Sequence, residues 1–219
     1  CCSESKGVLQ NTGVKMTEEG IEFLAALKEL GVDELTIEDI RIGGMTDFVL
    51  GKRLYEEAIK LLPFCTGLPD KAELRENIFQ GVLAGAEAAA KSFEKDDSTK
   101  AAARALTLYG LLKDAGHDEG EELYAGFYRK VLDAAEALLD AGDFAAAKSE
   151  YETLQDFEVP EALADAPDLN ELIMETEYRR AQYCTDEGEY LTARRIFDDL
   201  DNYKDSADKA SECVYLYAA

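Results

Sequence analysis

Tryptophan is absent from this 219-residue chain, and histidine and proline are scarce, with one His and 4 Pro. One histidine cannot complete a Cys2His2 zinc site, so zinc binding of that kind is excluded. With so few prolines, little interrupts the formation of helices. Alanine, which favours helices, occurs in runs such as residues 86–90. The composition is that of a helix-rich protein.

Basic residues are also in short supply, with 23 Lys and Arg against 47 Asp and Glu and a net charge of −24. Such a chain repels phosphate backbones, so we expect no nucleic-acid binding. For the same reason we expect no attachment to anionic lipid through a basic face. Two interpretations of the charge remain open. The acidic surface keeps the chain soluble, or its field steers a basic partner toward it.

Long apolar runs and zinc-ligand spacings are missing as well. No run reaches the roughly 18–20 apolar residues that span a bilayer, so we expect no transmembrane segment. The five cysteines lie at positions 1, 2, 65, 184 and 213, an odd number without the spacing of zinc ligands. Cys184 and Cys213 lie at apolar helical spacings, where a free thiol packs as a small hydrophobic group.

The first and last residues of the chain indicate how it is attached and whether it continues. Cys1 followed by the polar stretch Cys2-Ser3-Glu4-Ser5 resembles the mature start of a bacterial lipoprotein, which implies lipid attachment at Cys1 and a place in the cell envelope. The alternative is an arbitrary boundary, or thiols of a missing helix, which leaves the cytoplasm open. Residues 212–219 read as a helix without a cap, so we expect the chain to continue in a longer protein.

Apolar residues recur three and four positions apart through 17–30, 46–62, 69–94, 118–141 and 168–200. This is the period of helices, and we expect an all-α protein without a sheet. The expected organisation is a flexible leader at 1–15, an N-terminal helical region at 16–126 and helical repeats over 127–219 that continue beyond the end. Asp168 is expected to cap a helix of the repeat region.

One pattern occurs twice near the end of the chain, at residues 142–157 and 188–203, with an offset of 188 − 142 = 46. Self-similarity at such a period indicates a helical repeat array. We expect each glycine of the pattern in the turn between two helices and each small residue at a helix crossing. The repeat-defining residues are Gly142, Phe144, Ala147, Tyr151 and Leu154, matched by Gly188, Tyr190, Ala193, Phe197 and Leu200, with Tyr203 matching Phe157.

The second copy ends in a more specific signature, Asn202-Tyr203-Lys204-Asp205-Ser206-Ala207, followed by the pair Glu212-Cys213. On these residues the region 127–219 resembles the degenerate tetratricopeptide-like (TPR-like) repeats common in proteins of Gram-positive gut bacteria. The first copy departs from the pattern, with Phe157-Glu158-Val159-Pro160 in place of the turn. The resemblance implies helix hairpins stacked in an α-α superhelix, a role in protein–protein contact and no catalytic residues.

No other pattern indicates chemistry. His117 lies in a loop before a helix, with no nucleophile at a recognisable spacing. The acidic run 118–122 lacks the EF-hand pattern. Gly81 and Gly85 indicate close helix packing rather than membrane dimerisation. We therefore expect no catalytic, metal-binding or cofactor-binding residues, no cofactor and no enzymatic activity.

The expected function is a non-catalytic module that binds a protein or a peptide, for which a basic ligand is one candidate. The alternative is an accessory helical domain of a larger cell-envelope enzyme or transport system, lipid-anchored if Cys1 is modified. A helix that begins near residue 205 places Ala210, Cys213, Val214 and Tyr217 on one stripe. We expect this apolar stripe to be uncovered and to cause weak self-association.

Overall fold

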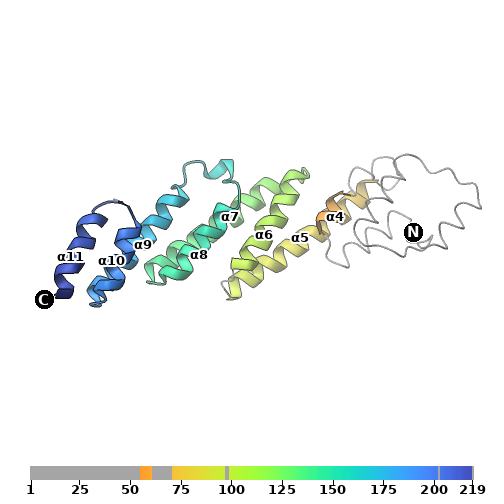
Figure 1. Ribbon diagram of the computed structural model, residues 1–219. Helices are drawn as coiled ribbons and strands as arrows, with labels where there is room; N and C mark the ends of the chain where they lie inside the picture. Colours follow the sequence, from red (N-terminus) through yellow and green to blue (C-terminus); the bar gives the residue numbers. More distant parts are fainter. Residues whose placement is uncertain (1–54, 61–70, 97–98, 202, 219) are drawn as a thin grey trace, which may run out of the picture. The chain divides into compact units, whose positions relative to one another are not determined.

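The computed structural model describes residues 55–60, 71–96, 99–201 and 203–218, which form helices joined by turns, with no strand among them (Figure 1). The all-α prediction is therefore confirmed for this part of the chain. The helices are α4 (Tyr55–Lys60), α5 (Lys71–Asp96), α6 (Thr99–Asp114), α7 (Gly120–Asp140), α8 (Phe144–Gln155), α9 (Leu169–Asp186), α10 (Tyr190–Asp199) and α11 (Ser206–Ala218). The leader 1–15 with Cys1 and the helix predicted at 17–30 lie outside the described residues.

The chain divides into two compact units. Unit 1 comprises residues 1–88 and 107–120, and unit 2 comprises residues 89–106 and 121–219. Helices α5 and α6 therefore contribute residues to both units. The predicted repeat region 127–219 lies wholly within unit 2.

Close helix packing in unit 1 depends on a glycine. A Cβ atom added to Gly85 on α5 would overlap the ring of Tyr55 on α4, so the tyrosine ring packs directly on the α5 backbone. In the loop before α7, His117 packs edge-on against Phe79, with ring centroids 5.0 Å apart. Its Nδ1 accepts a 3.2 Å hydrogen bond from the Glu119 N–H. This histidine therefore has a structural place in the turn that leads into α7.

In unit 2, the turn between α7 and α8 has the same hydrogen bonds as the turn between α9 and α10. In each turn the glycine N–H donates a hydrogen bond to the carbonyl three residues before it. The N–H of the next residue donates to the carbonyl five residues before its own position. These pairs are Gly142–Leu139 and Asp143–Leu138, then Gly188–Thr185 and Glu189–Cys184. Gly142 and Gly188 have φ angles of 81° and 78°, which only glycine adopts at little cost. Both turns are Schellman helix ends, and the predicted placement of the two glycines is confirmed.

Buried positions recur with the same 46-residue offset. The crossing alanines Ala147 and Ala193 are both fully buried. The aromatic positions Tyr151 and Phe197 are 0% and 1% exposed. One counterpart pair differs in polarity: Glu150, at 1% exposed, occupies the position of Ile196. The two hairpins therefore share one packing scheme, with one polar substitution.

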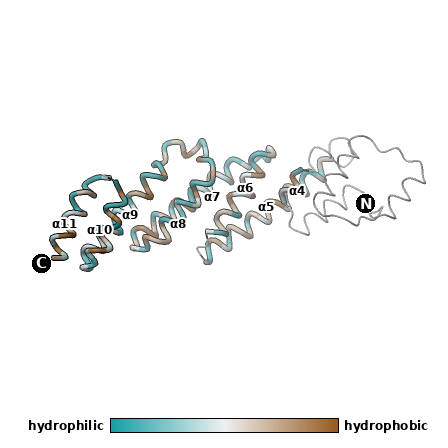
Figure 2. The backbone as a smooth tube through the Cα atoms, viewed as in Figure 1, coloured by the Kyte–Doolittle hydropathy of each residue, from teal (hydrophilic) through white to brown (hydrophobic). Residues whose placement is uncertain are grey.

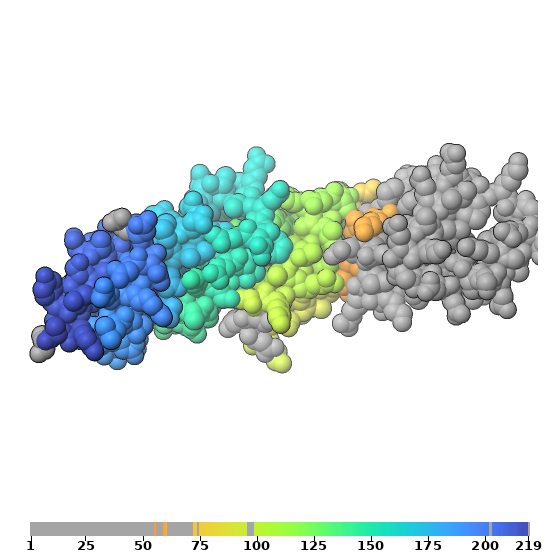
Figure 3. Space-filling view, viewed as in Figure 1, coloured from red at the N-terminus to blue at the C-terminus, as the bar shows by residue number. Residues whose placement is uncertain are grey.

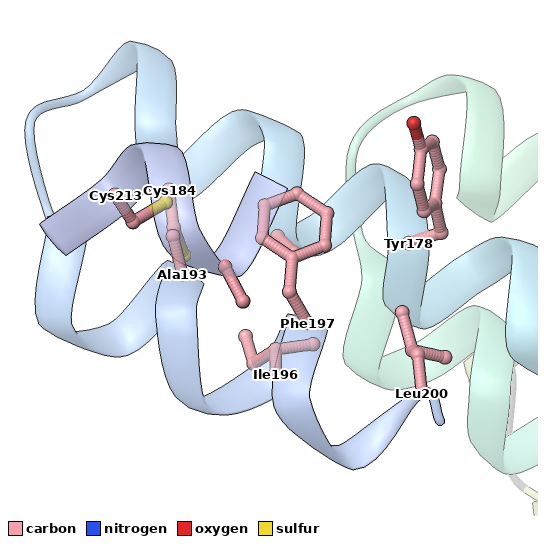
Figure 4. Packing of buried hydrophobic residues seen from close by; sticks show 9 residues of the cluster. Tyr178, Cys184, Ala193, Ile196, Phe197, Leu200 and Cys213 are labelled. Atoms are coloured by element: carbon pink, nitrogen blue, oxygen red, sulfur yellow. The ribbon is translucent and has the colours of Figure 1, made fainter. Parts of the chain in front are cut away.

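The helices of unit 2 pack in series. Helix α9 contacts α8 and α10, and α10 also contacts α11. Figure 4 shows the core that results around the second hairpin, where Phe197 and Ala193 of α10 lie among Tyr178 and Cys184 of α9 and Cys213 of α11. A hairpin has one apolar face that it cannot bury alone, and stacking buries it. This packing is consistent with an α-α superhelical fold.

The two hairpins differ in how each leads into the next helix. Helix α10 reaches α11 through residues 200–205, a turn in which Asp201 and Lys204 have φ angles of 41° and 52°. Helix α8 reaches α9 through residues 156–168, which we call the connector. The connector contains the short 3-10 helix η2 (Glu161–Leu163).

The exposed side of α11 differs from the stripe expected from the sequence. Ala210 and Cys213 are 4% and 1% exposed because they belong to the core around α9 and α10. The last turn of α11 carries the exposed apolar side chains Val214, Tyr215, Leu216 and Tyr217. Hydrophobic residues gather at this end of the tube in Figure 2, and α11 lies on the surface in Figure 3. The expectation that Ala210 and Cys213 are uncovered is therefore wrong.

Candidate functional site

The connector is fixed to the helices around it. Pro160 and Leu163 are both buried, which anchors the connector by its apolar side chains. The Tyr124 hydroxyl on α7 donates a 2.7 Å hydrogen bond to the Glu158 carbonyl. An apolar anchor together with a hydrogen bond to the backbone restricts a loop to one path. The surface beside the connector is therefore formed before any ligand arrives.

A groove of about 580 Å³ runs between the connector, α7 and the start of α9. Ligand pockets measure roughly 300–1,000 Å³, so several side chains of a ligand can enter it. Its apolar lining includes Tyr128 and Leu132 from α7 and Phe157, Val159, Pro160 and Pro167 from the connector. Its polar lining consists of Gln155, Glu161, Asp168 and Asn170. This combination of a largely apolar wall with few polar groups is typical of a binding site.

Tyr128 gives the groove a polar group beneath its apolar wall. The side chain is 1% exposed, and its hydroxyl makes no hydrogen bond to the described part of the chain. Burial raises the pKa of Tyr128, so its O–H stays neutral and keeps its proton for donation. A buried hydroxyl without a partner costs free energy. The hydroxyl is covered by protein atoms, so it lies behind the accessible surface of the groove.

The polar rim of the groove joins α8 to α9. Gln155 Nε2 donates a 2.9 Å hydrogen bond to Asn170 Oδ1. The Asp168 carboxylate accepts the Asn170 N–H at 2.7 Å and caps α9, as predicted. Glu161 is exposed. No Lys or Arg is among the described residues that line the groove, so the charge at its rim is negative.

A second cluster of charges, at the turn before α11, is internally paired. Glu175 on α9 accepts hydrogen bonds from Arg179 and from the Tyr203 hydroxyl, both at 3.2 Å, and from Lys204. Burial alone would raise the pKa of Glu175, but the hydrogen bonds from Lys204 and Arg179 outweigh it and lower that pKa. This cluster holds the turn of residues 200–205 against α9, and it has a structural explanation that needs no ligand.

The neighbouring Tyr178 contributes to the same anchoring. Its hydroxyl donates a hydrogen bond to the Asp205 carboxylate at the start of α11. This bond, together with burial, raises the pKa of Tyr178 to about 12. The same bond lowers the pKa of Asp205.

The repeat-defining residues build the hairpins and do not line the groove. Of the residues in the repeated segment 142–157, Gln155 and Phe157 line the groove. The signal in the sequence is the departure of the first copy from the turn pattern at Phe157-Glu158-Val159-Pro160. Insertions in repeat proteins fall in loops on one face, often the binding face.

The described residues contain neither a cluster of metal-ligand side chains nor a helix suited to span a membrane. Within them no group of three or more His, Cys, Asp or Glu side chains is placed to hold a metal ion. Cys184 and Cys213 are free thiols in the core, and burial raises the pKa of Cys184, which makes it less reactive. Among the described helices, none is both long enough and apolar enough to cross a bilayer.

Comparison of the chain with protein-family models, with curated proteins and with solved structures gave no match. The residues that line the groove beside the connector are therefore the basis for assigning a function.

Proposed function

We propose that this chain is a non-catalytic module of TPR-like helical repeats that binds a segment of a partner protein. The observation that supports this most directly is the groove of about 580 Å³ beside the connector. It is apolar along most of its wall, and Tyr124 and Leu163 hold the connector that borders it. Grooves of this kind bind peptides through apolar anchors. The shared Schellman turns and buried positions of the two hairpins support the repeat assignment.

Val159 offers the sharpest test because it lines the groove and is 50% exposed. A phage-displayed library of random dodecapeptides is selected on the wild-type protein, and affinities of the selected peptides are measured by fluorescence anisotropy. Val159→Ser should weaken binding about five- to tenfold, because it removes apolar contact area from the groove.

Val214→Ser is the matched control. Val214 is 42% exposed, lies on α11 and does not line the groove. The same substitution there should leave peptide affinity unchanged. If the library yields no binder, or if the binders respond equally to both substitutions, the proposed function is wrong.

The alternative is an accessory domain of a larger cell-envelope protein. It is supported by Cys1 and the polar residues that follow it. The test is mass spectrometry of the N-terminal peptide after expression of the complete reading frame in a bacterial host. A lipid mass on Cys1, and loss of membrane association in Cys1→Ala, would support a lipid anchor. An unmodified Cys1 would contradict it.

We also propose weak self-association through the last turn of α11. Val214, Tyr215, Leu216 and Tyr217 are exposed, and residues 213–218 contain no charged side chain. A second copy therefore meets an uncharged apolar surface on an otherwise acidic molecule. Because each copy carries a net charge of −24, association should increase with salt, which screens the repulsion. Light scattering with Val214→Ser/Tyr217→Ser tests this, and a wild-type monomer at every concentration and salt would contradict it.

A further inference from the structure

We propose that the groove beside the connector selects a basic segment with an apolar anchor: Lys or Arg residues flanking one or two Leu, Pro or aromatic side chains. This inference rests on the proposed function and names the ligand class of the same groove. The apolar anchor would contact Val159 and its neighbours, and the cationic side chains would meet the carboxylates of the rim.

The charge along the chain around the groove is of one sign. Residues 149–178, which include the end of α8, the connector and the first half of α9, contain no Lys and no Arg. Their acidic residues are Glu150, Glu152, Asp156, Glu158, Glu161, Asp165, Asp168, Glu171, Glu175 and Glu177. A one-sign field over a low-dielectric surface attracts ligands of the opposite sign. This segment therefore favours a cationic ligand.

The basic residues that bound this segment are already engaged. Lys148 Nζ lies 3.0 Å from the Glu177 carboxylate. Arg179 pairs with Glu175 at 3.2 Å and with Asp140 at 3.3 Å. These contacts hold the nearest cations against carboxylates of the helices. The negative charge at the groove rim is therefore left for a ligand to neutralise.

The two carboxylates that line the groove, Glu161 and Asp168, form no ion pair within the described part of the chain. They lie beside the apolar residues Val159 and Pro167 in the lining. A ligand that matches this arrangement places a cation next to an apolar side chain. Apolar contact supplies affinity here, and the charges supply selectivity.

The experiment uses the peptides selected from the random dodecapeptide library on the wild-type protein. We expect these peptides to be enriched in Lys and Arg next to apolar residues. Their affinity should fall as ionic strength is raised from about 0.05 M to about 0.5 M, because exposed ion pairs are screened. Glu161→Gln/Asp168→Asn should weaken them about two- to tenfold. Asparagine still caps a helix, so α9 keeps its start.

A second pair of substitutions separates a local effect from the overall charge. Asp186→Asn/Glu187→Gln changes the net charge by the same amount at exposed positions near the end of α9, outside the groove lining. It should leave affinity unchanged within about twofold, because a rim charge acts locally at moderate salt. Circular dichroism confirms that both variants remain folded.

Each remaining outcome is decisive. If the selected peptides are neutral or acidic yet respond to Val159→Ser, the basic ligand class is wrong while the proposed function stands. If both charge pairs weaken binding equally, the preference belongs to the whole acidic molecule and the inference is also wrong. If no selected peptide responds to Val159→Ser, the proposed function itself fails.

Discussion

The hairpins α7–α8 and α9–α10 share the same turn and packing pattern as far as Phe157 and its counterpart Tyr203. They differ in the segment that follows. Phe157 N–H bonds the Leu154 carbonyl at 3.1 Å, and its counterpart Tyr203 N–H bonds the Leu200 carbonyl at 3.0 Å. Beyond this point the first hairpin continues into the connector, whereas the second turns at once into α11. The comparison shows that residues within a hairpin set its own geometry, while the segment after it can vary. The groove lies beside the first hairpin because only that one is followed by a long connector.

The two linking segments are also held by different means. The short turn depends on polar contacts to α9, from Lys204 to Glu175 and from Tyr178 to Asp205. The connector depends on the buried Leu163 and on the bond from Tyr124 to the Glu158 backbone. A bond to the backbone does not occupy Val159, which stays half exposed in the groove lining. In the short turn, by contrast, the side chains of Lys204 and Asp205 themselves make the contacts to α9.

The largest effect in this comparison should come from overpacking a helix crossing. Ala147→Leu and Ala193→Leu should each lower the free energy of unfolding by about 1–3 kcal/mol, because both alanines are fully buried. Urea unfolding measures the change. Ala145→Leu is the control, since Ala145 is exposed and its counterpart 46 residues later is already Leu191, at 56% exposed. An unchanged stability in either crossing variant would show that the two crossings are not equivalent.

The turn glycines should give the next effect. Gly142→Ala and Gly188→Ala should each destabilise by about 1 kcal/mol, because alanine disfavours the left-handed conformation. Nothing lies within 4 Å of a Cβ at either position, so sterics with neighbours add no cost. Gly126→Ala, in the middle of α7 with equally open space, should instead stabilise by up to about 1 kcal/mol. Thermal unfolding of the three variants tests whether the turns demand glycine; equal shifts in all three would contradict it.

A smaller effect should follow pH at the short turn. The folded-state pKa of Glu175 lies below its ordinary value of 4.5, so its contribution is present above that pH and is lost as pH falls through the lowered value. Glu175→Gln should therefore destabilise by at most about 1 kcal/mol near neutral pH and become neutral in acid. Urea unfolding across pH measures this. A pH-independent cost of Glu175→Gln would contradict the assignment.

The smallest effect is expected at the groove. Val159→Ser should change the free energy of unfolding by no more than about 0.5 kcal/mol, because half of the side chain is already exposed. Thermal unfolding beside Val214→Ser checks this. A large loss at Val159 alone would mean that the residue holds the connector in place rather than facing a ligand.

Much of the fold could be predicted because its signals are local. The helix predicted at 118–141 is observed at Gly120–Asp140, and Asp168 caps α9 as expected. The Schellman glycines could be identified because their φ requirement is a property of single residues. Tyr124 and Tyr128 were not among the core residues that the sequence singled out, although both are buried. Tyr124 bonds the connector backbone at Glu158, 34 residues away in the chain, and Tyr128 lines the groove beside the connector.

The sequence by itself determined the helices, the two glycine turns and the burial of Ala147 and Ala193 at equivalent positions. These follow from hydrophobic period and backbone sterics, which act over a few residues. Only the tertiary structure decided that Ala210 and Cys213 are covered while the last turn of α11 is bare. It also decided that the connector borders a groove whose rim has no cation among its described residues. Both depend on which distant helices meet, and no local pattern encodes that.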